Sequence, residues 1–398
     1  MPTREFDVVL FGATGFTGRL VAAYLAGARA DLRWAVAGRR ADALAELAAG
    51  LTGATPQVIT ADANDADALA ALARRTRVVA STAGPFARLG GPLVAACVGA
   101  GTHYADLTGE VTWVAQMIEA HHAAALASGA RIVHCCGFDS IPSDLGAQLV
   151  IDAAHARHGA PPRRVVARFG KMRGGVSGGT VASALAMVEA AVADRSVRRV
   201  MADPYALTPG WRGDDRDVHR PGWDAVAGTF TAPFVMAGIN SRVVRRSRLL
   251  LDDVDRARFA YDEQLQLPRS VGGAVAAVAV AAGLAALPVI AATSIGRRAL
   301  AARAPAPGTG PSPEAQARGR FVVDLRAELD DADPVTATVR CDDADPGYAA
   351  TARMLGESAL CLAFDELASP GGVTTPAAAM GPALRARLDR AGVRFELR

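Results

Sequence analysis

The chain opens on Phe6-Asp-Val-Val-Leu-Phe-Gly-Ala-Thr-Gly-Phe-Thr-Gly18, and this stretch decides the fold. An apolar, β-branched run leads into three glycines spaced G-x-x-G-x-x-G, and a helical pattern of apolar residues follows at once. A strand, a glycine turn and a helix in this order are the context of a dinucleotide-binding loop. The first glycine allows the tight turn, the second admits a pyrophosphate, and the third lets the helix pack closely on the strand. We therefore predict a Rossmann domain whose cofactor loop contains Gly12, Thr14, Gly15, Phe16, Thr17 and Gly18.

The end of the second predicted strand, residues 32–38, indicates which nicotinamide cofactor is bound. NAD-binding proteins commonly place Asp or Glu there to bond the ribose 2′-hydroxyl, whereas this chain continues with two arginines. A guanidinium suits a 2′-phosphate by its charge and its bidentate geometry. We therefore predict NADP(H), with Arg39 as the main contact and Arg40 as the second. The alternative is two solvated arginines opening the helix 41–49, which the helix dipole disfavours.

Two further strands, residues 57–62 and 77–83, continue the predicted sheet. Asp62 ends the third strand, where it either flanks the adenine or caps the next helix. A glycine-proline turn follows the fourth strand. Ligands of open parallel sheets lie along the carboxyl edge of the strands. We therefore expect cofactor contacts from Ala83, Gly84, Pro85 and Phe86.

Length and composition limit the class of protein. At 398 residues the chain is long enough for two or three domains, and 51% hydrophobic residues indicate a globular protein. We expect an NADP-binding domain over 1–150, an α+β substrate domain over 151–346, and a C-terminal helix and tail over 347–398. A net charge of +3 is too small to argue for nucleic acid. The five cysteines show no metal or disulfide spacing and no signal peptide is expected, so we predict no metal and a cytoplasmic setting.

The second half of the nucleotide domain contains the candidate catalytic residues. Tyr104 lies on a short predicted strand, where it either donates a proton or is a buried tyrosine satisfied by a neighbour. A later strand, residues 131–136, ends in Gly137-Phe-Asp-Ser-Ile-Pro-Ser-Asp144 at the same carboxyl edge as the glycine loop. We expect Asp139 and Ser140 to contact nicotinamide or substrate. Helix capping by Ser140 is the alternative interpretation, and both roles can hold together.

Five motifs taken together resemble a known family. They are Phe11-Gly-Ala-Thr-Gly-Phe-Thr-Gly18, Ala37-Gly-Arg-Arg40, Ala83-Gly-Pro-Phe86, Tyr104-Ala-Asp-Leu-Thr-Gly-Glu110 and Gly137-Phe-Asp-Ser-Ile-Pro-Ser-Asp144. As a set they resemble the saccharopine dehydrogenase-like oxidoreductases, most closely the actinobacterial branch with the trans-acting enoyl reductases of mycobacterial phthiocerol and glycolipid biosynthesis. The resemblance implies an NADP-type Rossmann domain, a central α+β domain and a C-terminal segment that returns to the nucleotide domain. It also implies reduction of an enoyl group on a lipid or polyketide chain carried by a separate synthase.

The second domain offers two features with competing interpretations. A glycine-rich turn, residues 174–180, precedes a helix; it binds an anionic group, faces the nicotinamide, or is a plain turn capped by Ser177 and Thr180. A basic cluster on an expected helix could receive a carrier-protein phosphopantetheine, an acidic carrier surface or lipid headgroups. A solvated face or internal ion pairs are the default interpretation of such a cluster. It comprises Arg242, Arg245, Arg246 and Arg248.

One apolar segment departs from the pattern of a water-soluble protein. Residues 270–296 are 27 consecutive uncharged residues with Arg269 before them and Arg297-Arg298 after them. A helix of this length reaches roughly 40 Å, enough to cross a bilayer core. We favour a lipid-facing or interfacial helix at the inner face of the plasma membrane, with a buried core or dimer helix next and a true span last. A Pro-rich linker over 303–313 follows, and residues 321–329 and 335–341 predict a β-hairpin.

These features define an α/β protein, a Rossmann domain (doubly wound parallel sheet) with a second α+β domain that carries an apolar helix. The working hypothesis is an NADPH-dependent reductase of an α,β-unsaturated acyl chain that a carrier protein delivers. Backbone N–H groups near Gly84, or Ser140, would stabilise the enolate oxygen, and Tyr104 would supply the proton. One alternative is a carbonyl or imine reductase. Another is a membrane-associated NADP-binding scaffold without turnover. A homodimer is also compatible with the sequence.

Overall fold

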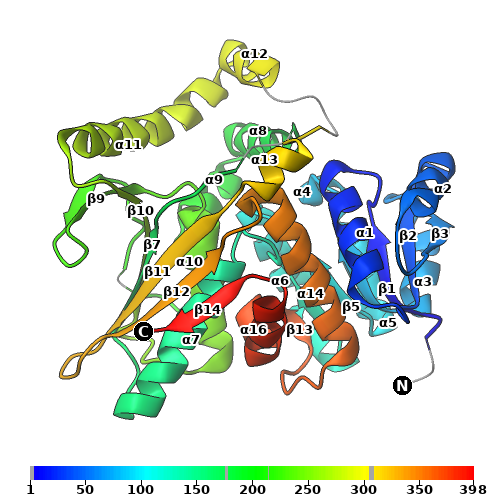
Figure 1. Cartoon of the computed structure of the whole chain (residues 1–398). Helices are drawn as coiled ribbons and strands as arrows, with labels where there is room; N and C mark the ends of the chain where they lie inside the picture. Colours follow the sequence, from blue (N-terminus) through cyan, green and yellow to red (C-terminus); the bar gives the residue numbers. More distant parts are fainter. Residues whose placement is uncertain (1–3, 175–177, 214, 304–308) are drawn as a thin grey trace.

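The computed structural model describes residues 4–174, 178–213, 215–303 and 309–398, and it contains two seven-stranded sheets with helices packed on them (Figure 1). The strands are β1 (Phe6–Phe11), β2 (Trp34–Gly38), β3 (Gln57–Thr60), β4 (Thr76–Ser81), β5 (His103–Asp106), β6 (Arg131–Val133), β7 (Arg164–Phe169), β8 (Gly222–Asp224), β9 (Thr229–Pro233), β10 (Ala260–Leu267), β11 (Phe321–Glu328), β12 (Val335–Cys341), β13 (Gly372–Thr374) and β14 (Arg394–Leu397).

The helices alternate with the strands in the first half of the chain and cluster on the second sheet afterwards. They are α1 (Phe16–Ala28), α2 (Ala41–Gly50), α3 (Ala66–Arg75), α4 (Phe86–Leu89), α5 (Gly91–Ala100), α6 (Val111–Ser128), α7 (Ile141–His158), α8 (Gly178–Ala193), α9 (Arg195–Ala202), α10 (Ala237–Leu251), α11 (Val271–Ala292), α12 (Ser294–Arg303), α13 (Pro313–Ala317), the π-helix η1 (Pro346–Ala350), α14 (Thr351–Phe364), α15 (Pro376–Ala379) and α16 (Gly381–Arg390).

The first sheet has the order β13-β6-β5-β4-β1-β2-β3, and all of its pairings are parallel. Every residue of β1 is buried, because a central strand covered by helices on both faces needs a continuous apolar run. Within this sheet, the strand order β6-β5-β4-β1-β2-β3 is that of a Rossmann domain. The predicted fold class is therefore confirmed. The strand order reverses between β1 and β4, and ligands bind at the carboxyl edge of such a switch point.

The second sheet is mixed, with the order β14-β12-β11-β7-β10-β9-β8, and only β7 and β10 pair in parallel. The predicted hairpin is confirmed as the antiparallel pair β11 and β12. Helix α7 leaves the first sheet and packs on these two strands, so it connects the two halves of the molecule. Both sheets contribute to one large buried apolar cluster that runs through the boundary between them.

The C-terminal quarter of the chain contacts both sheets. Helix α14 packs against α1, β4 and β5 of the Rossmann domain, and β13 extends that sheet beyond β6. The contact with α1 is close, because a Cβ on Gly356 would lie 2.4 Å from the Tyr24 ring. Strand β14 instead pairs with β12 at the edge of the second sheet.

Candidate active site

The phosphate loop between β1 and α1 shows why glycine stands at two of its three positions. Gly12 has a φ of +82°, and a Cβ there would lie 2.9 Å from the backbone N of Ala83. A Cβ on Gly18 would lie 2.4 Å from the carbonyl oxygen of Gly12, so this glycine lets the helix approach the turn. Gly15 differs, because the nearest atom to its Cβ would be a carbonyl oxygen at 3.4 Å. The fold therefore leaves space above Gly15, where a pyrophosphate approaches in this motif.

The N-terminus of α1 is unoccupied by the protein itself. Its N-cap residue is Gly15, no side chain caps it, and its first turn has no acidic residue. Other helices of the protein are capped, such as α3 by Asp65 and α11 by Ser270. The first N–H groups of α1 are therefore available, together with the helix dipole, for an anionic ligand.

The arginines after β2 lie beside this loop. Both Arg39 and Arg40 are exposed, and no acidic residue ends β2. Arg40 donates a hydrogen bond from Nη2 to Oγ1 of Thr14 at 3.2 Å, which places its guanidinium over the loop. Arg39 makes no hydrogen bond or ion pair within the part of the chain that the structure describes, so its guanidinium can turn toward a ligand. These residues fit the 2′-phosphate of NADPH by charge and position.

Asp62 lies at the same edge after β3 but does not cap the next helix. Its Oδ1 accepts hydrogen bonds from the backbone N of Asn64 at 2.8 Å and from the side-chain amide of Asn64 at 3.1 Å. The cap of α3 is Asp65, whose Oδ1 accepts from the backbone N of Ala68 at 3.0 Å. The capping alternative for Asp62 is therefore wrong, because the N-cap of the helix lies three residues later.

Glu110 is a functional residue that the sequence reasoning missed. This buried carboxylate accepts hydrogen bonds from the backbone N of Phe86 at 2.9 Å and of Ala87 at 2.8 Å. The N–H of Gly84 donates to the carbonyl oxygen of Thr82 at 3.1 Å. These N–H groups are therefore already used, and the expected stabilisation of an enolate oxygen near Gly84 is not what this geometry provides. The only sequence signal was the position of Glu110 at the end of a polar motif.

Tyr104 is fully buried in the Rossmann core. Its side chain has no exposed surface, and its hydroxyl finds no hydrogen-bond partner among the described residues. Burial, and then the charge of Asp106, raise the pKa of Tyr104 well above its ordinary value. A side chain in this position cannot touch a substrate, so the proposed role of Tyr104 as a proton donor is corrected to that of a core residue.

Asp106 and His134 form a buried pair between the loops that follow β5 and β6. Oδ2 of Asp106 lies 2.7 Å from Nδ1 of His134. Its Oδ1 accepts hydrogen bonds from the backbone N of Thr108 at 3.0 Å and of Cys135 at 3.2 Å. One carboxylate thus ties together the two loops at the carboxyl edge, and Cys135 is held at a φ of +63°.

Asp139 lies in the loop after β6, where the sequence predicted it. The residue is half-buried, and its Oδ2 is inaccessible and without a hydrogen-bond partner among the described residues. Burial raises the pKa of Asp139 to about 7, and the Asp106 carboxylate acts in the same direction. Next to it, the backbone N of Phe138 donates to Oγ1 of Thr351 at 3.0 Å, which anchors the loop to α14. Burial therefore favours the protonated form of the Asp139 carboxyl group near neutral pH.

Ser140 contacts the second domain rather than the solvent. It is fully buried, and its Oγ donates to Oδ1 of Asn240 on α10 at 3.0 Å. Asn240 in turn donates to Glu263 at 2.9 Å, and Tyr261 donates to the same carboxylate at 2.6 Å. Ser140 stands at the N-cap position of α7 but makes no side-chain cap. Both expected roles of Ser140, substrate contact and capping, are therefore wrong, and it links the domains instead.

The basic cluster on α10 is internal. Arg242 pairs with Asp217 at 3.0 Å and Arg245 with Asp215 at 2.7 Å, and all four arginines are at most 2% exposed. Arg246 donates to the carbonyl oxygen of Leu207, and Arg248 pairs with Asp253. The interpretation as a docking surface for a carrier or lipid headgroups is wrong, and internal ion pairs are confirmed. The other candidate of this domain, the turn at 174–180, has residues 175–177 outside the described part of the chain, as has the middle of the linker, 304–308.

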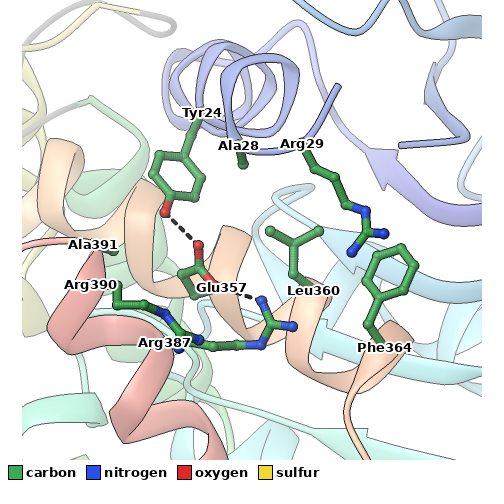
Figure 2. Close-up of a pocket in the computed structure, with 9 residues that line it drawn as sticks. All are labelled: Tyr24, Ala28, Arg29, Glu357, Leu360, Phe364, Arg387, Arg390 and Ala391. Carbon is green, nitrogen blue, oxygen red and sulfur yellow. Dashed lines mark hydrogen bonds and ion pairs between the residues drawn. The ribbon is translucent and has the colours of Figure 1, made fainter. Parts of the chain in front are cut away.

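A cavity of about 270 Å³ lies between α1, α14 and α16, on the side of α1 away from the phosphate loop (Figure 2). Its polar groups pair with one another, because the Tyr24 hydroxyl donates to Glu357 at 2.6 Å and Arg387 bonds the same carboxylate at 3.2 Å. Arg29 lies against the Phe364 ring. This cavity is therefore separate from the cofactor site. The described residues contain no group of three or more His, Cys, Asp or Glu that could hold a metal ion.

Comparison with known proteins agrees with this geometry. Residues 8–133 match the saccharopine dehydrogenase NADP binding domain family. The chain is 40% identical to trans-acting enoyl reductases of Mycobacterium tuberculosis and Mycobacterium leprae, over 98% of this chain and 97% of each relative. It belongs to their family. Among solved structures, saccharopine dehydrogenase (L-Glu forming) from Saccharomyces cerevisiae matches 98% of this chain and 99% of its own at 15% identity and a TM-score of 0.54, which shows the shared fold.

The family and the site lead to one cofactor and one class of enzyme. The chain is an NADP-dependent oxidoreductase that uses NADPH. The phosphates of this cofactor would fit the glycine loop at Gly15, the uncapped helix N-terminus and the arginines after β2.

Proposed function

We propose that this protein is a trans-acting enoyl reductase that reduces an α,β-unsaturated acyl or polyketide chain made by a separate synthase for lipid or glycolipid biosynthesis. The observation that carries the proposal is the identity of 40% with named trans-acting enoyl reductases over nearly the whole chain. The predicted cofactor contacts belong to the same proposal, as do the domain boundaries near residues 150 and 346. The proposal also includes delivery of the acyl or polyketide substrate by a carrier protein. It further includes contact of the enzyme with the inner face of the plasma membrane.

In this reaction the bound NADPH supplies a hydride to the β-carbon of the enoyl group. The residues of the protein position the reactants and deliver the proton. The loop around Gly15, with Arg39, would hold the phosphates, and Glu110 fixes the turn after β4 at the same carboxyl edge. Asp139 then protonates the α-carbon of the enolate, because a carboxyl group with a pKa of about 7 is still substantially protonated at neutral pH.

Aromatic side chains beside Asp139 support an apolar substrate. Phe138, the residue before it, is half-exposed, and its ring centroid lies 4.8 Å from Phe321 and 6.1 Å from Phe169. Phe169 stacks on Phe234 with ring centroids 3.8 Å apart. These rings come from both domains, and Phe169, Phe234 and Phe321 are buried, so Phe138 is the partly exposed ring of the group beside Asp139. An acyl chain is better matched to this apolar ring than an amino-acid substrate with charged groups.

The deciding experiment is NADPH oxidation with a long-chain 2-enoyl carrier-protein thioester, followed by the mass of the product. We expect a gain of two hydrogens with NADPH and much slower reaction with NADH. A 3-oxoacyl thioester serves as the control for a carbonyl reductase. Reduction of the oxo group alone would refute the enoyl assignment, and binding of NADPH without oxidation by either acceptor would indicate a scaffold.

A further inference from the structure

Helix α11 reverses the usual residue pattern of a surface helix, because its small residues face the protein and its larger apolar residues face outward. Its protein-facing positions carry small residues, with Gly273 and Ala277 buried one turn apart. Its outward positions carry valines, and Val275 and Val278 are 63% and 58% exposed. Only 11% of its most apolar stretch is buried, although it is the one described helix that is long and apolar enough to cross a bilayer. A helix in water buries its large apolar residues, so the outward face of α11 is built for another apolar environment.

The neighbours of α11 constrain its orientation. The helix packs along β9 and β10 and against α8, and it lies on the outside of the second sheet (Figure 1). Its 22 residues extend about 33 Å along this surface. A helix fixed to a sheet along one side cannot cross a bilayer without leaving that sheet. It can instead lie parallel to the surface with its outward face immersed.

The ends of α11 favour an anionic lipid surface over a second protein. Residues 264–313 contain four arginines and no acidic residue. Arg269, just before the helix, is exposed and lies 5.8 Å from the ring centroid of Trp223, which is itself 47% exposed. Tryptophan and arginine beside an apolar face are the residues that membrane-bound helices place at headgroup level. The positive charge complements anionic headgroups.

We infer that α11 docks this enzyme on the surface of an anionic phospholipid bilayer, with Val271, Val275 and Val278 inserted and with Trp223 and Arg269 at the headgroups. The inference deepens the proposed function, because it gives the reductase a position where apolar acyl chains accumulate. Its test needs no substrate, so failure of membrane docking and failure of enoyl reduction are read out separately.

Trp223 makes the docking directly measurable. The protein has four tryptophans, of which Trp34, Trp113 and Trp211 are buried, so a change in fluorescence on adding vesicles reports Trp223. We expect a blue shift with phosphatidylcholine vesicles that contain phosphatidylglycerol, quenching by brominated acyl chains, and loss of the shift in Trp223→Phe. Vesicles of phosphatidylcholine alone should bind more weakly, and added salt should weaken the binding to anionic vesicles.

The double variant Val275→Asp/Val278→Asp tests the insertion itself. Both positions are exposed, so the variant should fold and bind NADPH as the wild type does. We expect its partitioning onto anionic vesicles, measured by flotation, to fall at least about tenfold, since acidic groups oppose insertion at the acyl boundary. The matched control, Val58→Asp/Leu397→Asp, places the same two charges at exposed apolar positions of β3 and β14 and should float like the wild type.

Three outcomes would overturn the inference. Wild-type protein could fail to bind either kind of vesicle, or the α11 variant could bind as well as the control. Sedimentation velocity could also show a dimer that the α11 variant dissociates and that does not bind vesicles, in which case a second copy of the chain covers α11.

Discussion

The carboxylate of Glu110 accepts a hydrogen bond from the backbone N of Phe86 at 2.9 Å, so the residue before α6 fixes the turn that follows β4. Its other oxygen accepts from the backbone N of Ala87, the next residue of α4. A negative charge at this helix N-terminus is favourable, and the bonds set the direction in which the turn leaves the sheet.

We expect Glu110→Ala to lower the free energy of unfolding by about 2–4 kcal/mol, because bonds to a charged acceptor contribute roughly 1.5–3 kcal/mol each and do not add fully. Denaturant unfolding measures this change, and calorimetric titration should show weaker NADPH binding. The control is Glu119→Ala at an exposed position of α6, the helix that follows Glu110. Equal stability and equal NADPH affinity in the two variants would mean that Glu110 does not position the turn.

Arg39→Ala should reduce the preference for NADPH over NADH. A guanidinium bonded to a phosphate contributes roughly 1.5–3 kcal/mol, so the NADPH dissociation constant should rise about 10- to 100-fold while that of NADH changes little. Fluorescence titration with the two nucleotides gives both constants. Arg29→Ala is the control, since Arg29 borders the cavity at the other end of α1 (Figure 2). A parallel loss of NADH binding would show that Arg39 acts on the fold of the loop instead.

Asp139 should give the reaction a pH dependence near neutrality. The proposed role requires the protonated carboxyl, so kcat/KM should fall as the pH rises through about 7. Asp139→Asn cannot donate a proton in this way, and we expect it to lower kcat roughly 100-fold and to remove the decline. NADPH binding by the variant should stay close to that of the wild type. An unchanged profile in Asp139→Asn would assign the decline to another group.

The sequence was sufficient to predict those structural features whose interacting residues are neighbours in the chain. The strand, turn and helix of the phosphate loop are contiguous, and the steric requirement at Gly18 comes from the Gly12 carbonyl oxygen six residues earlier. The β11–β12 hairpin is likewise local, since two alternating apolar runs flank one acidic turn. For the same reason the apolar pattern of α11 was visible before the structure, whereas its exposed face was not.

Other features depend on contacts between distant segments, which no local pattern reveals. The partner of Ser140 is Asn240, one hundred residues later, so its resemblance to a helix cap was misleading. The acidic partners of Arg242 and Arg245 lie in an irregular loop before α10, so no local pattern could separate a surface cluster from internal ion pairs. Glu110 and Asp106 accept hydrogen bonds from backbone N–H groups, which nearly every residue carries, so the sequence did not reveal their partners.

The buried carboxyl of Glu263 should make the stability of the protein depend on pH. Burial raises the pKa of Glu263 from an ordinary value of 4.5 to about 7, so the folded protein holds this proton more tightly than the unfolded chain does. The stabilisation from proton uptake is therefore fully present below pH 4.5 and is lost as the pH rises through about 7, with a slope of at most about 1.4 kcal/mol per pH unit.

Glu263→Gln keeps the shape of this side chain without its charge, so the free energy of unfolding should fall less steeply between pH 5 and pH 7 than in the wild type. Urea unfolding at several pH values measures the slope. Glu119→Gln on the surface of α6 should keep the wild-type slope. If Glu263→Gln also kept it, the carboxyl would be ionised in the folded protein throughout this range. Its bonds to Asn240 and Tyr261 would then hold a buried charge between the two domains.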